Sequence, residues 1–279
     1  MRVLFRADAD GEIGSGHVMR CTALATRLRK VGIDSILVAA NLPAPIQKWM
    51  RRENLEFRLI AGNPSRHPET DAQEVTRVIL DCADVGVVVV DHYGLDSRWE
   101  EKIRPLVGAL WVIDDLANRP HSCDVLLDPG LHFEPDRRYR NWVPTNCRQL
   151  LGPRYALLRP EFDFRPDDKL ADGSLANLFI YLGSGRDMGP KIATVLQAVS
   201  ELDNRPKTRV LLGPLPDSEA VRKHVEMSYP HVQVIGTSSA MASLLRRANL
   251  CVGVCGVSAW ERCSLGIPTL TAITAPNQI

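Results

Sequence analysis

The chain has 279 residues, more than one ordinary domain needs, and fits two domains of about 140 residues each. Hydrophobic residues make up 45 % and charged residues 24 % of the composition, as in soluble globular proteins. With 34 basic and 33 acidic residues the net charge is +1, which argues against a broad electrostatic surface for nucleic acid or anionic membranes.

The first half of the chain alternates short apolar runs with helical patterns. Strands are predicted at 3–5, 35–40, 56–60, 87–90, 110–113 and 125–127, and helices at 17–31, 45–53, 71–82 and 96–106. The run at 87–90 is four valines, typical of a strand that is buried on both faces. This β-α-β rhythm predicts a parallel sheet with helices on both faces. From about 129 to 154 we expect irregular structure.

A polar, turn-like segment at 165–169 marks the expected domain boundary, and the same rhythm restarts after it. Strands are predicted at 177–182, 208–212, 232–235, 250–254 and 269–273, and helices at 190–201, 218–227, 239–247 and 258–265. We therefore expect two Rossmann-like, doubly wound α/β domains, an N-terminal one over 1–165 and a C-terminal one over 175–279.

The cysteines and the longest apolar run bear on the compartment. The seven cysteines are odd in number and irregularly spaced, which favours reduced thiols, and no second His or Cys pair accompanies Cys251 and Cys255 to form a zinc site. The run at 85–90 is far shorter than the roughly 20 apolar residues of a membrane span. The N-terminus reads as a strand and not as a targeting segment. We expect a soluble, cytoplasmic protein.

Ligands of open α/β sheets bind at the carboxyl ends of the strands, and the first such loop is glycine-rich. It ends in Gly14-Ser15-Gly16-His17 at the start of a helix. The spacing matches neither the dinucleotide fingerprint nor a P-loop, and a plain turn with a structural histidine explains it as well. A helix start disfavours the imidazolium form, so His17 is also suited to accept a proton from water.

Two further strand ends in the first half carry polar groups. Asp91-His92-Tyr93-Gly94 follows the most buried strand and either faces a ligand or forms a satisfied turn with a packed tyrosine. Asp114 and Asp115 follow the strand at 110–113. This pair could hold Mg²⁺, orient a base or cap the next turn, and the sequence leaves the three readings open.

In the second half, two loops present small residues before a helix. They are Gly183-Ser184-Gly185-Arg186-Asp187 and the segment from Gly256 to Glu261. Backbone N–H groups of such turns bind phosphate, and a carboxylate one turn into the helix can bond ribose hydroxyls. Two anion-binding helix starts in one half predict a nucleotide diphosphate ligand.

Taken together, these motifs resemble a known enzyme family. Its marks are Gly14-Ser15-Gly16-His17 with Arg20, Asp91-His92-Tyr93-Gly94, Asp114-Asp115-Leu116, the segment 152–159, the segment 258–262 and Asn277-Gln278. In order and spacing they resemble the UDP-2,4-diacetamido-2,4,6-trideoxy-β-L-altropyranose hydrolases of pseudaminic acid biosynthesis. The resemblance implies a GT-B fold, with two Rossmann-like domains facing across a cleft, similar to the glycosyltransferase that forms lipid II.

The resemblance also implies a reaction and a set of site residues. The reaction is inverting hydrolysis at the anomeric carbon with release of UDP, without metal or cofactor. His17 would be the general base, and Gly14, Gly16, Arg20, Tyr93 and Asn277 would contact the sugar. The nucleotide residues would be Gly183, Ser184, Gly185, Gly256, Val257 and Ser258 at the diphosphate, Glu261 at the ribose and Ile235 at the uracil. The expected partner is a UDP-linked amino sugar, bound by a monomer.

Two departures and two alternatives accompany this reading. Gly185-Arg186 stands where a more regular Gly-Gly-x-Asp turn is expected, and the sequence stops at Ile279, where family members carry a further helix, so we expect a truncated C-terminal domain. The first alternative is a GT-B glycosyltransferase with a UDP-sugar donor. Such an enzyme would need an apolar, basic patch for its acceptor, and the nearest candidate, Trp49-Met50-Arg51-Arg52, is better explained as a helix that packs on the core. The second alternative is a non-catalytic nucleotide-sugar binding protein.

Overall fold

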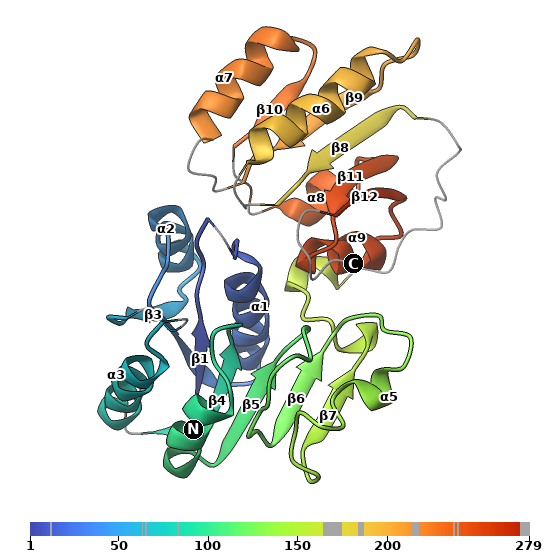
Figure 1. The fold of residues 1–279 in the computed structure, drawn as a ribbon. Helices are drawn as coiled ribbons and strands as arrows, with labels where there is room; N and C mark the ends of the chain where they lie inside the picture. The colour runs from blue at the N-terminus through green and yellow to red at the C-terminus, as the bar shows by residue number, and fades with distance from the viewer. Residues whose placement is uncertain are drawn as a thin grey trace. The chain divides into compact units, whose positions relative to one another are not determined.

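The computed structural model describes every residue except 12, 63, 65, 83, 164–174, 184–186, 214–217, 237, 239 and 274–279. The chain divides into two compact units, one of Met1–Ala9 and His17–Arg159 and the other of Asp10–Gly16 and Pro160–Ile279. Each unit holds one parallel sheet with helices packed on it (Figure 1).

The first sheet has seven parallel strands in the order β3-β2-β1-β4-β5-β6-β7. The strands are β1 (Arg2–Ala7), β2 (Asp34–Ala39), β3 (Glu56–Leu59), β4 (Val85–Asp91), β5 (Ala109–Ile113), β6 (Val125–Asp128) and β7 (Arg148–Leu151). The helices between them are α1 (Gly16–Lys30), α2 (Ala44–Arg52), α3 (Pro68–Asp81), α4 (Ser97–Ile103) and the short α5 (Pro135–Arg138). The 3-10 turns η1 (Arg104–Leu106), η2 (Pro153–Tyr155) and η3 (Pro160–Phe162) complete this part of the chain.

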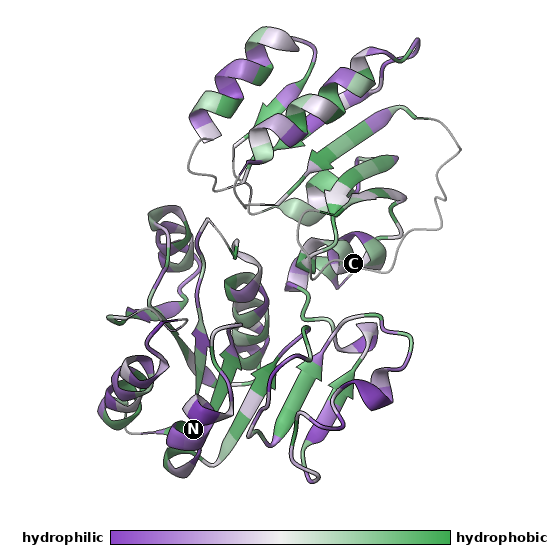
Figure 2. Ribbon diagram, in the orientation of Figure 1, coloured by the Kyte–Doolittle hydropathy of each residue, from purple (hydrophilic) through white to green (hydrophobic). Residues whose placement is uncertain are grey.

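The two faces of this sheet carry separate apolar cores. Leu4 of β1 packs with side chains of α3 and α4, whereas its neighbours Val3 and Phe5 pack with side chains of α1 and α2. This alternation is the two-residue period of a strand, and both faces are apolar because helices cover both. Figure 2 shows the result as apolar central strands and mixed outer helices.

The second sheet has five parallel strands in the order β10-β9-β8-β11-β12. The strands are β8 (Asn177–Tyr181), β9 (Lys207–Leu211), β10 (Gln233–Ile235), β11 (Leu250–Val254) and β12 (Thr269–Ala272). The helices are α6 (Met188–Ser200), α7 (Ser218–Ser228), α8 (Met241–Leu245) and α9 (Val257–Ser264). Its core joins strand residues such as Ile180 and Val210 with Ile192 and Leu196 of α6.

The prediction of two doubly wound parallel sheets is confirmed, and one local expectation is wrong. The region 129–154 is not irregular throughout, because it contains α5 and the edge strand β7, which pairs in parallel with β6. An edge strand has only one neighbouring strand and can be less apolar than a central strand. The polar residues Arg148 and Gln149 therefore gave no strand pattern in the sequence. Across the described ranges, no helix is long and apolar enough to span a membrane.

Candidate active site

The order of strands in the first sheet reverses beside β1. From β1 the chain builds outward through β2 and β3, and it then returns to place β4 on the other side of β1. The loops that leave β1 and β4 therefore separate at the carboxyl edge, and this switch point is the usual ligand site of doubly wound sheets. His17 follows the loop after β1, while Asp91 and Tyr93 lie at the end of β4.

His17 and Asp91 are in direct contact at this switch point. The Nδ1 atom of His17 lies 2.5 Å from Oδ1 of Asp91, and the two residues are 5 % and 0 % exposed. An ionised carboxylate only accepts hydrogen bonds, so Nδ1 carries the proton and donates it, and Nε2 keeps its lone pair. No described residue bonds to that Nε2 atom. The imidazole is thus oriented by a carboxylate as well as placed at a helix start.

Arg20, one turn further along α1, holds the other edge of the same carboxylate. Its Nε lies 2.5 Å from Oδ2 of Asp91 and its Nη2 lies 2.6 Å from Oδ1, which is a bidentate pair. Burial alone would raise the pKa of Asp91, but the charge of Arg20 and the hydrogen bonds from Arg20 and His17 outweigh it and hold that pKa well below its usual range. Asp91 therefore stays ionised and remains an acceptor for His17.

Tyr93 and Asp115 complete the group. The Tyr93 hydroxyl donates to Oδ1 of Asp115 at 2.7 Å, and Nη1 of Arg20 lies 3.0 Å from Oδ2 of the same carboxylate. The Tyr93 ring meets the His17 ring edge-on, with centroids 4.6 Å apart and planes at 86°. Burial, together with Asp115, raises the pKa of Tyr93 above its usual value, so its hydroxyl is a proton donor and not a phenolate.

The two adjacent acids Asp114 and Asp115 belong to different networks. Asp114 accepts from the backbone N–H of Ala117 at 2.8 Å and from Arg119 at 2.6 Å, so it caps the turn that follows β5. Asp115 faces Arg20 and Tyr93 instead. Of the three readings left open by the sequence, the structure gives the cap to Asp114. In the part of the chain that the structure describes, no three His, Cys, Asp or Glu side chains gather as metal ligands.

A second buried ion cluster lies beside this group, under the ends of β1 and β4. Arg6 is 0 % exposed and pairs with Asp8 at 2.7 Å and with Asp71 at 2.5 Å. Asp8 also faces Nε2 of His92 at 3.3 Å, and Asp71 accepts from the indole N–H of Trp99 at 2.9 Å. These side chains satisfy one another and fix the strand ends on which His17 and Tyr93 depend.

Gly14 and Gly16, the predicted glycines of the first loop, have different structural roles. Gly14 has a φ of 72°, which favours glycine, and its N–H bonds back to the carbonyl of Asp10 at 3.0 Å. Gly16 is the first residue of α1, directly before His17. Both therefore shape the entry into the helix that carries the histidine.

The second sheet has its own switch point between β8 and β11. Gly183 follows β8 with a φ of 87°, and a Cβ added there would lie 3.6 Å from the Val254 side chain at the end of β11. The two loops predicted to bind diphosphate thus leave neighbouring strands. Ser184 and Gly185 lie outside the described residues, as does Asn277.

Gly256 precedes α9 and has a φ of −116°, a conformation open to any residue. No atom of the described residues lies within 4 Å of the position that its Cβ would take. The fold therefore gives no reason for a glycine here, whereas close approach of a ligand to the backbone would. The N–H groups of Val257 and Ser258 are the first of α9, and within the described ranges neither has a partner.

Arg262 stabilises this helix start from beneath. It is 1 % exposed, and its guanidinium donates to Ser258 Oγ at 3.0 Å and to the carbonyl of Val254 at 2.8 Å. It also packs against Gly253, where an added Cβ would lie 2.6 Å from Nη1. Sequence reasoning gave Arg262 no role, although a basic residue four positions after a helix-start serine was visible.

The last two predicted nucleotide residues are placed as follows. Ile235 ends β10, and its carbonyl already accepts from the N–H of Leu212 at 2.9 Å. Glu261 lies one turn into α9 and is 5 % exposed. A carbonyl oxygen has two lone pairs, so a uracil N–H donating to Ile235 would make a second hydrogen bond to the same oxygen.

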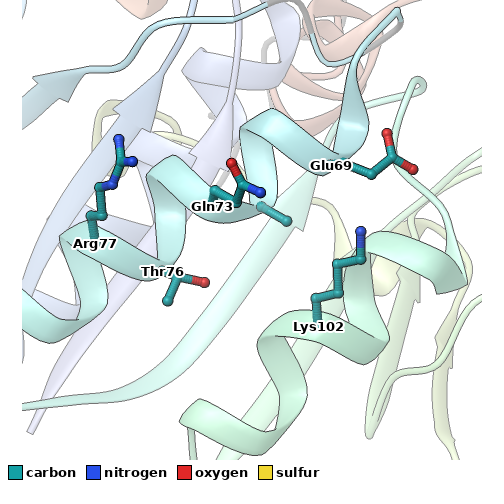
Figure 3. A pocket seen from close by; sticks show the side chains of 6 residues that line it. Glu69, Gln73, Thr76, Arg77 and Lys102 are labelled. Carbon is teal, nitrogen blue, oxygen red and sulfur yellow. The ribbon is translucent and has the colours of Figure 1, made fainter.

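None of these residues lines the surface pocket of about 450 Å³ that the first unit carries. It is lined by Glu69, Ala72, Gln73, Thr76 and Arg77 of α3 and by Lys102 of α4 (Figure 3). Arg77 is paired with Glu74 on its own helix. Its volume would hold a small molecule, but none of the predicted site residues lines it, so the candidate site remains the carboxyl edge of the sheet.

These two parallel sheets, each with a switch point in its strand order, have the GT-B architecture. MurG of Acinetobacter baumannii superimposes with a TM-score of 0.61 over 99 % of this chain and 80 % of its own length, at 15 % identity. Other solved GT-B glycosyltransferases reach a TM-score of 0.63. No protein-family model matches the sequence.

Sequence relatives are more specific. The chain is 29 % identical to the UDP-2,4-diacetamido-2,4,6-trideoxy-β-L-altropyranose hydrolase of Campylobacter jejuni subsp. jejuni, over 76 % of this chain and 68 % of that protein. It is 25 % identical to the spore coat polysaccharide biosynthesis protein SpsG of Bacillus subtilis, over 100 % of this chain and 79 % of that protein. The resemblance read from the motifs is confirmed by these similarities.

Proposed function

We propose that this chain is a nucleotide-sugar hydrolase in which His17 activates a water molecule for attack on the anomeric carbon of a UDP-linked sugar. Nε2 of His17 takes a proton from the water as its oxygen bonds to the anomeric carbon. The bond from that carbon to the diphosphate oxygen breaks, and UDP leaves with the bonding electrons. Attack opposite the leaving group inverts the anomeric configuration.

The observation that carries this proposal is the contact between Asp91 and Nδ1 of His17 at 2.5 Å. It leaves Nε2 as the basic nitrogen and stabilises the imidazolium that forms when the proton arrives. A positioned base of this kind contributes about 10²–10⁴-fold to a rate. Arg20 keeps Asp91 in place, so the pair is rigid before substrate binds.

Departure of the diphosphate is the second requirement, and residues of the second unit are suited to it. Among the described residues the N–H groups at the start of α9 have no partner and the space over Gly256 is open, and both features favour an anion close to the backbone. Gly183, Gly256, Val257 and Ser258 would hold the phosphates in the proposal, with Glu261 at the ribose. Stabilising the charge of the leaving group is how such donors accelerate bond cleavage.

The substrate we propose is the one named for the Campylobacter relative, UDP-2,4-diacetamido-2,4,6-trideoxy-β-L-altropyranose. Tyr93, edge-on against His17, would contact the sugar in this proposal, as would Gly14, Gly16, Arg20 and Asn277. The reaction as proposed uses no metal, so dialysis against EDTA should leave the rate unchanged.

The test is incubation of the chain with this UDP-sugar in H₂¹⁸O, without an acceptor, followed by NMR and mass spectrometry. We expect release of UDP, an inverted sugar as the first product, and ¹⁸O in the sugar and not in UDP. Label in the phosphate would mean cleavage at phosphorus and would overturn the proposal. UDP release that depends on an added acceptor would establish the rival glycosyltransferase function.

Two variants complete the design. His17→Asn should lower turnover at least about a hundredfold while UDP affinity, measured by calorimetry, stays within about twofold. His224→Asn is the matched control, because His224 is exposed on α7 and makes none of the contacts described for His17. Unchanged turnover in His17→Asn would exclude this residue as the base. Binding of UDP with no hydrolysis by the unsubstituted chain would support a binding protein.

A further inference from the structure

Five side chains, of which His17 is one, form a closed ring of contacts. His17 bonds to Asp91, Asp91 to Arg20, Arg20 to Asp115 and Asp115 to Tyr93, and the Tyr93 ring returns to the edge of His17. They come from the start of α1, the end of β4 and the end of β5. All five contacts have been described above as pairs, and Asp115 is the member of the ring whose role the sequence left open.

Asp115 is the member that joins the two sides of the ring. One carboxylate oxygen accepts from the Tyr93 hydroxyl at 2.7 Å and the other accepts from Nη1 of Arg20 at 3.0 Å. Its own carbonyl accepts from Nη2 of Arg138 at 2.6 Å, and Arg138 is itself paired with Asp128 at the end of β6. Asp115 is thus held on the protein side while its carboxylate holds two residues next to the imidazole.

The charges of the ring support the same assignment. Before reaction, Arg20 carries one positive charge, and Asp91 and Asp115 carry two negative charges in all. Proton uptake by His17 brings the group to neutrality, so the second carboxylate balances the imidazolium. Without Asp115 the hydroxyl of Tyr93 and one guanidinium nitrogen of Arg20 would also lose the acceptors that fix them.

We propose that Asp115 is a positioning residue of this site, which holds Tyr93 edge-on against His17 and, through Arg20, holds Asp91 on Nδ1 of that histidine. The assignment rests on the proposed function for its kinetic consequence. Asp115 does not touch the reacting atoms; it acts through Tyr93 and Arg20.

The kinetic experiment is a double-mutant cycle on turnover of the UDP-sugar. Asp115→Ala should lower kcat at least about tenfold and raise KM by a smaller factor, because the base loses its orientation while Tyr93 and Arg20 remain present to contact the sugar. Since Asp115 acts partly through Tyr93, Asp115→Ala with Tyr93→Phe should cost less than the product of the two single effects. Asp115→Asn keeps an acceptor for Tyr93 but not the charge, so its kcat should fall between wild type and Asp115→Ala.

Asp96→Ala is the comparison for a merely structural carboxylate. Asp96 accepts from the N–H of Arg98 at 3.0 Å and caps α4 in the same unit, so its loss should lower Tm and leave kcat unchanged. A kcat of Asp115→Ala within twofold of wild type would overturn the proposal. Single effects that multiply in the double variant would also overturn it.

A second measurement does not depend on turnover. Long-range ¹H–¹⁵N spectra of histidine-labelled protein, with His17 assigned from the His17→Asn variant, report which ring nitrogen carries the proton. Wild type should show the proton on Nδ1, and Asp115→Ala should show a mixture of both tautomers. An unchanged spectrum in Asp115→Ala would contradict the positioning role. If wild-type chain releases no UDP, the proposed function fails, and this spectrum still decides the role of Asp115.

Discussion

Asp91 and His17 are 74 positions apart in the sequence, and Oδ1 of Asp91 lies 2.5 Å from Nδ1 of His17. The contact exists because β4 returns to pair with β1 in parallel, with Ala7 aligned on Asp91. The last residue of the most apolar strand is therefore a carboxylate that contacts the start of α1, the helix that follows β1. Because Asp91 is 0 % exposed, its charge requires the hydrogen bonds from His17 and Arg20.

We expect Asp91→Asn to reduce turnover by about a hundredfold or more at near-wild-type KM. The amide has the shape of the carboxylate but not its charge, so it neither stabilises the imidazolium nor fixes the Nδ1 tautomer. Steady-state kinetics with the UDP-sugar measure the effect. Asp34→Asn, an exposed carboxylate in the same unit, is the control and should behave as wild type. A kcat within threefold of wild type would show that Asp91 is only structural.

We expect Gly256→Ala to weaken UDP binding about tenfold, equivalent to about 1.4 kcal/mol, and to leave Tm unchanged. The reason is the open space where the new Cβ would lie and the ordinary φ of −116°, which make the substitution harmless to the fold. Calorimetry with UDP and thermal unfolding without it give the two numbers. Wild-type affinity in this variant would place the diphosphate elsewhere.

The buried Arg6 cluster predicts loss of stability in acid. Burial pushes the pKa of Asp8 up, but His92 and Arg6 outweigh it and hold that pKa well below its usual value. A carboxyl whose pKa is lowered by folding contributes stability above its unfolded pKa of about 3.9, and that contribution is lost as the pH falls below it. Asp8 should therefore cause no change in Tm between about pH 5 and 7, and Tm should fall below about pH 4 as the Asp8 contribution is lost.

Asp8→Asn tests the source of this acid sensitivity. It should lower stability at neutral pH by about 3–5 kcal/mol, because it breaks a buried ion pair, and Tm should then fall less steeply with acid. Asp34→Asn is again the control, with wild-type stability at both pH values. A variant as steep in acid as wild type would assign the sensitivity to other carboxyls.

The cysteines predict a two-step reaction with a thiol reagent. Cys255 and Cys263 are exposed, whereas Cys21, Cys123 and Cys251 are fully buried and burial raises the pKa of Cys251 to about 11. Two thiols should therefore react with Ellman's reagent quickly in native protein, and all seven in urea. Serine at 255 and 263 should remove the fast phase. Cys82 is only partly buried, so a surviving fast phase of more than one thiol would contradict the burial of Cys21, Cys123, Cys147 and Cys251.

The sheets were predictable because their central strands are short apolar runs with turns between them. The four valines at 87–90 specify a strand buried on both faces, and β4 is that strand. Strand β7 was missed because Arg148-Gln149-Leu150-Leu151 pairs at one edge only and is not fully buried. A strand with only one neighbouring strand shows less of the apolar pattern by which central strands are recognised in a sequence.

The candidate site was predictable in its parts but not in its contacts. Glycine turns and helix starts pointed to His17, Tyr93 and the Gly256 segment, since those signals are local. The pairing of Asp91 with His17 depends on which strands are neighbours, and strand order is not written in any single segment. A charged residue at the end of an apolar strand was the available signal for Asp91, because burial demands a partner for it.

Gly253 and Arg262 constrain each other in space, and we expect this contact to restrict which residues the two positions accept. The guanidinium occupies the position that any side chain at 253 would need, so a larger residue in β11 is compatible only with a smaller one at 262. Losing the arginine would also release Ser258, at the start of α9. Among relatives, the two positions should therefore be inherited as a pair, and a sequence that changes one without the other should have rebuilt this helix start.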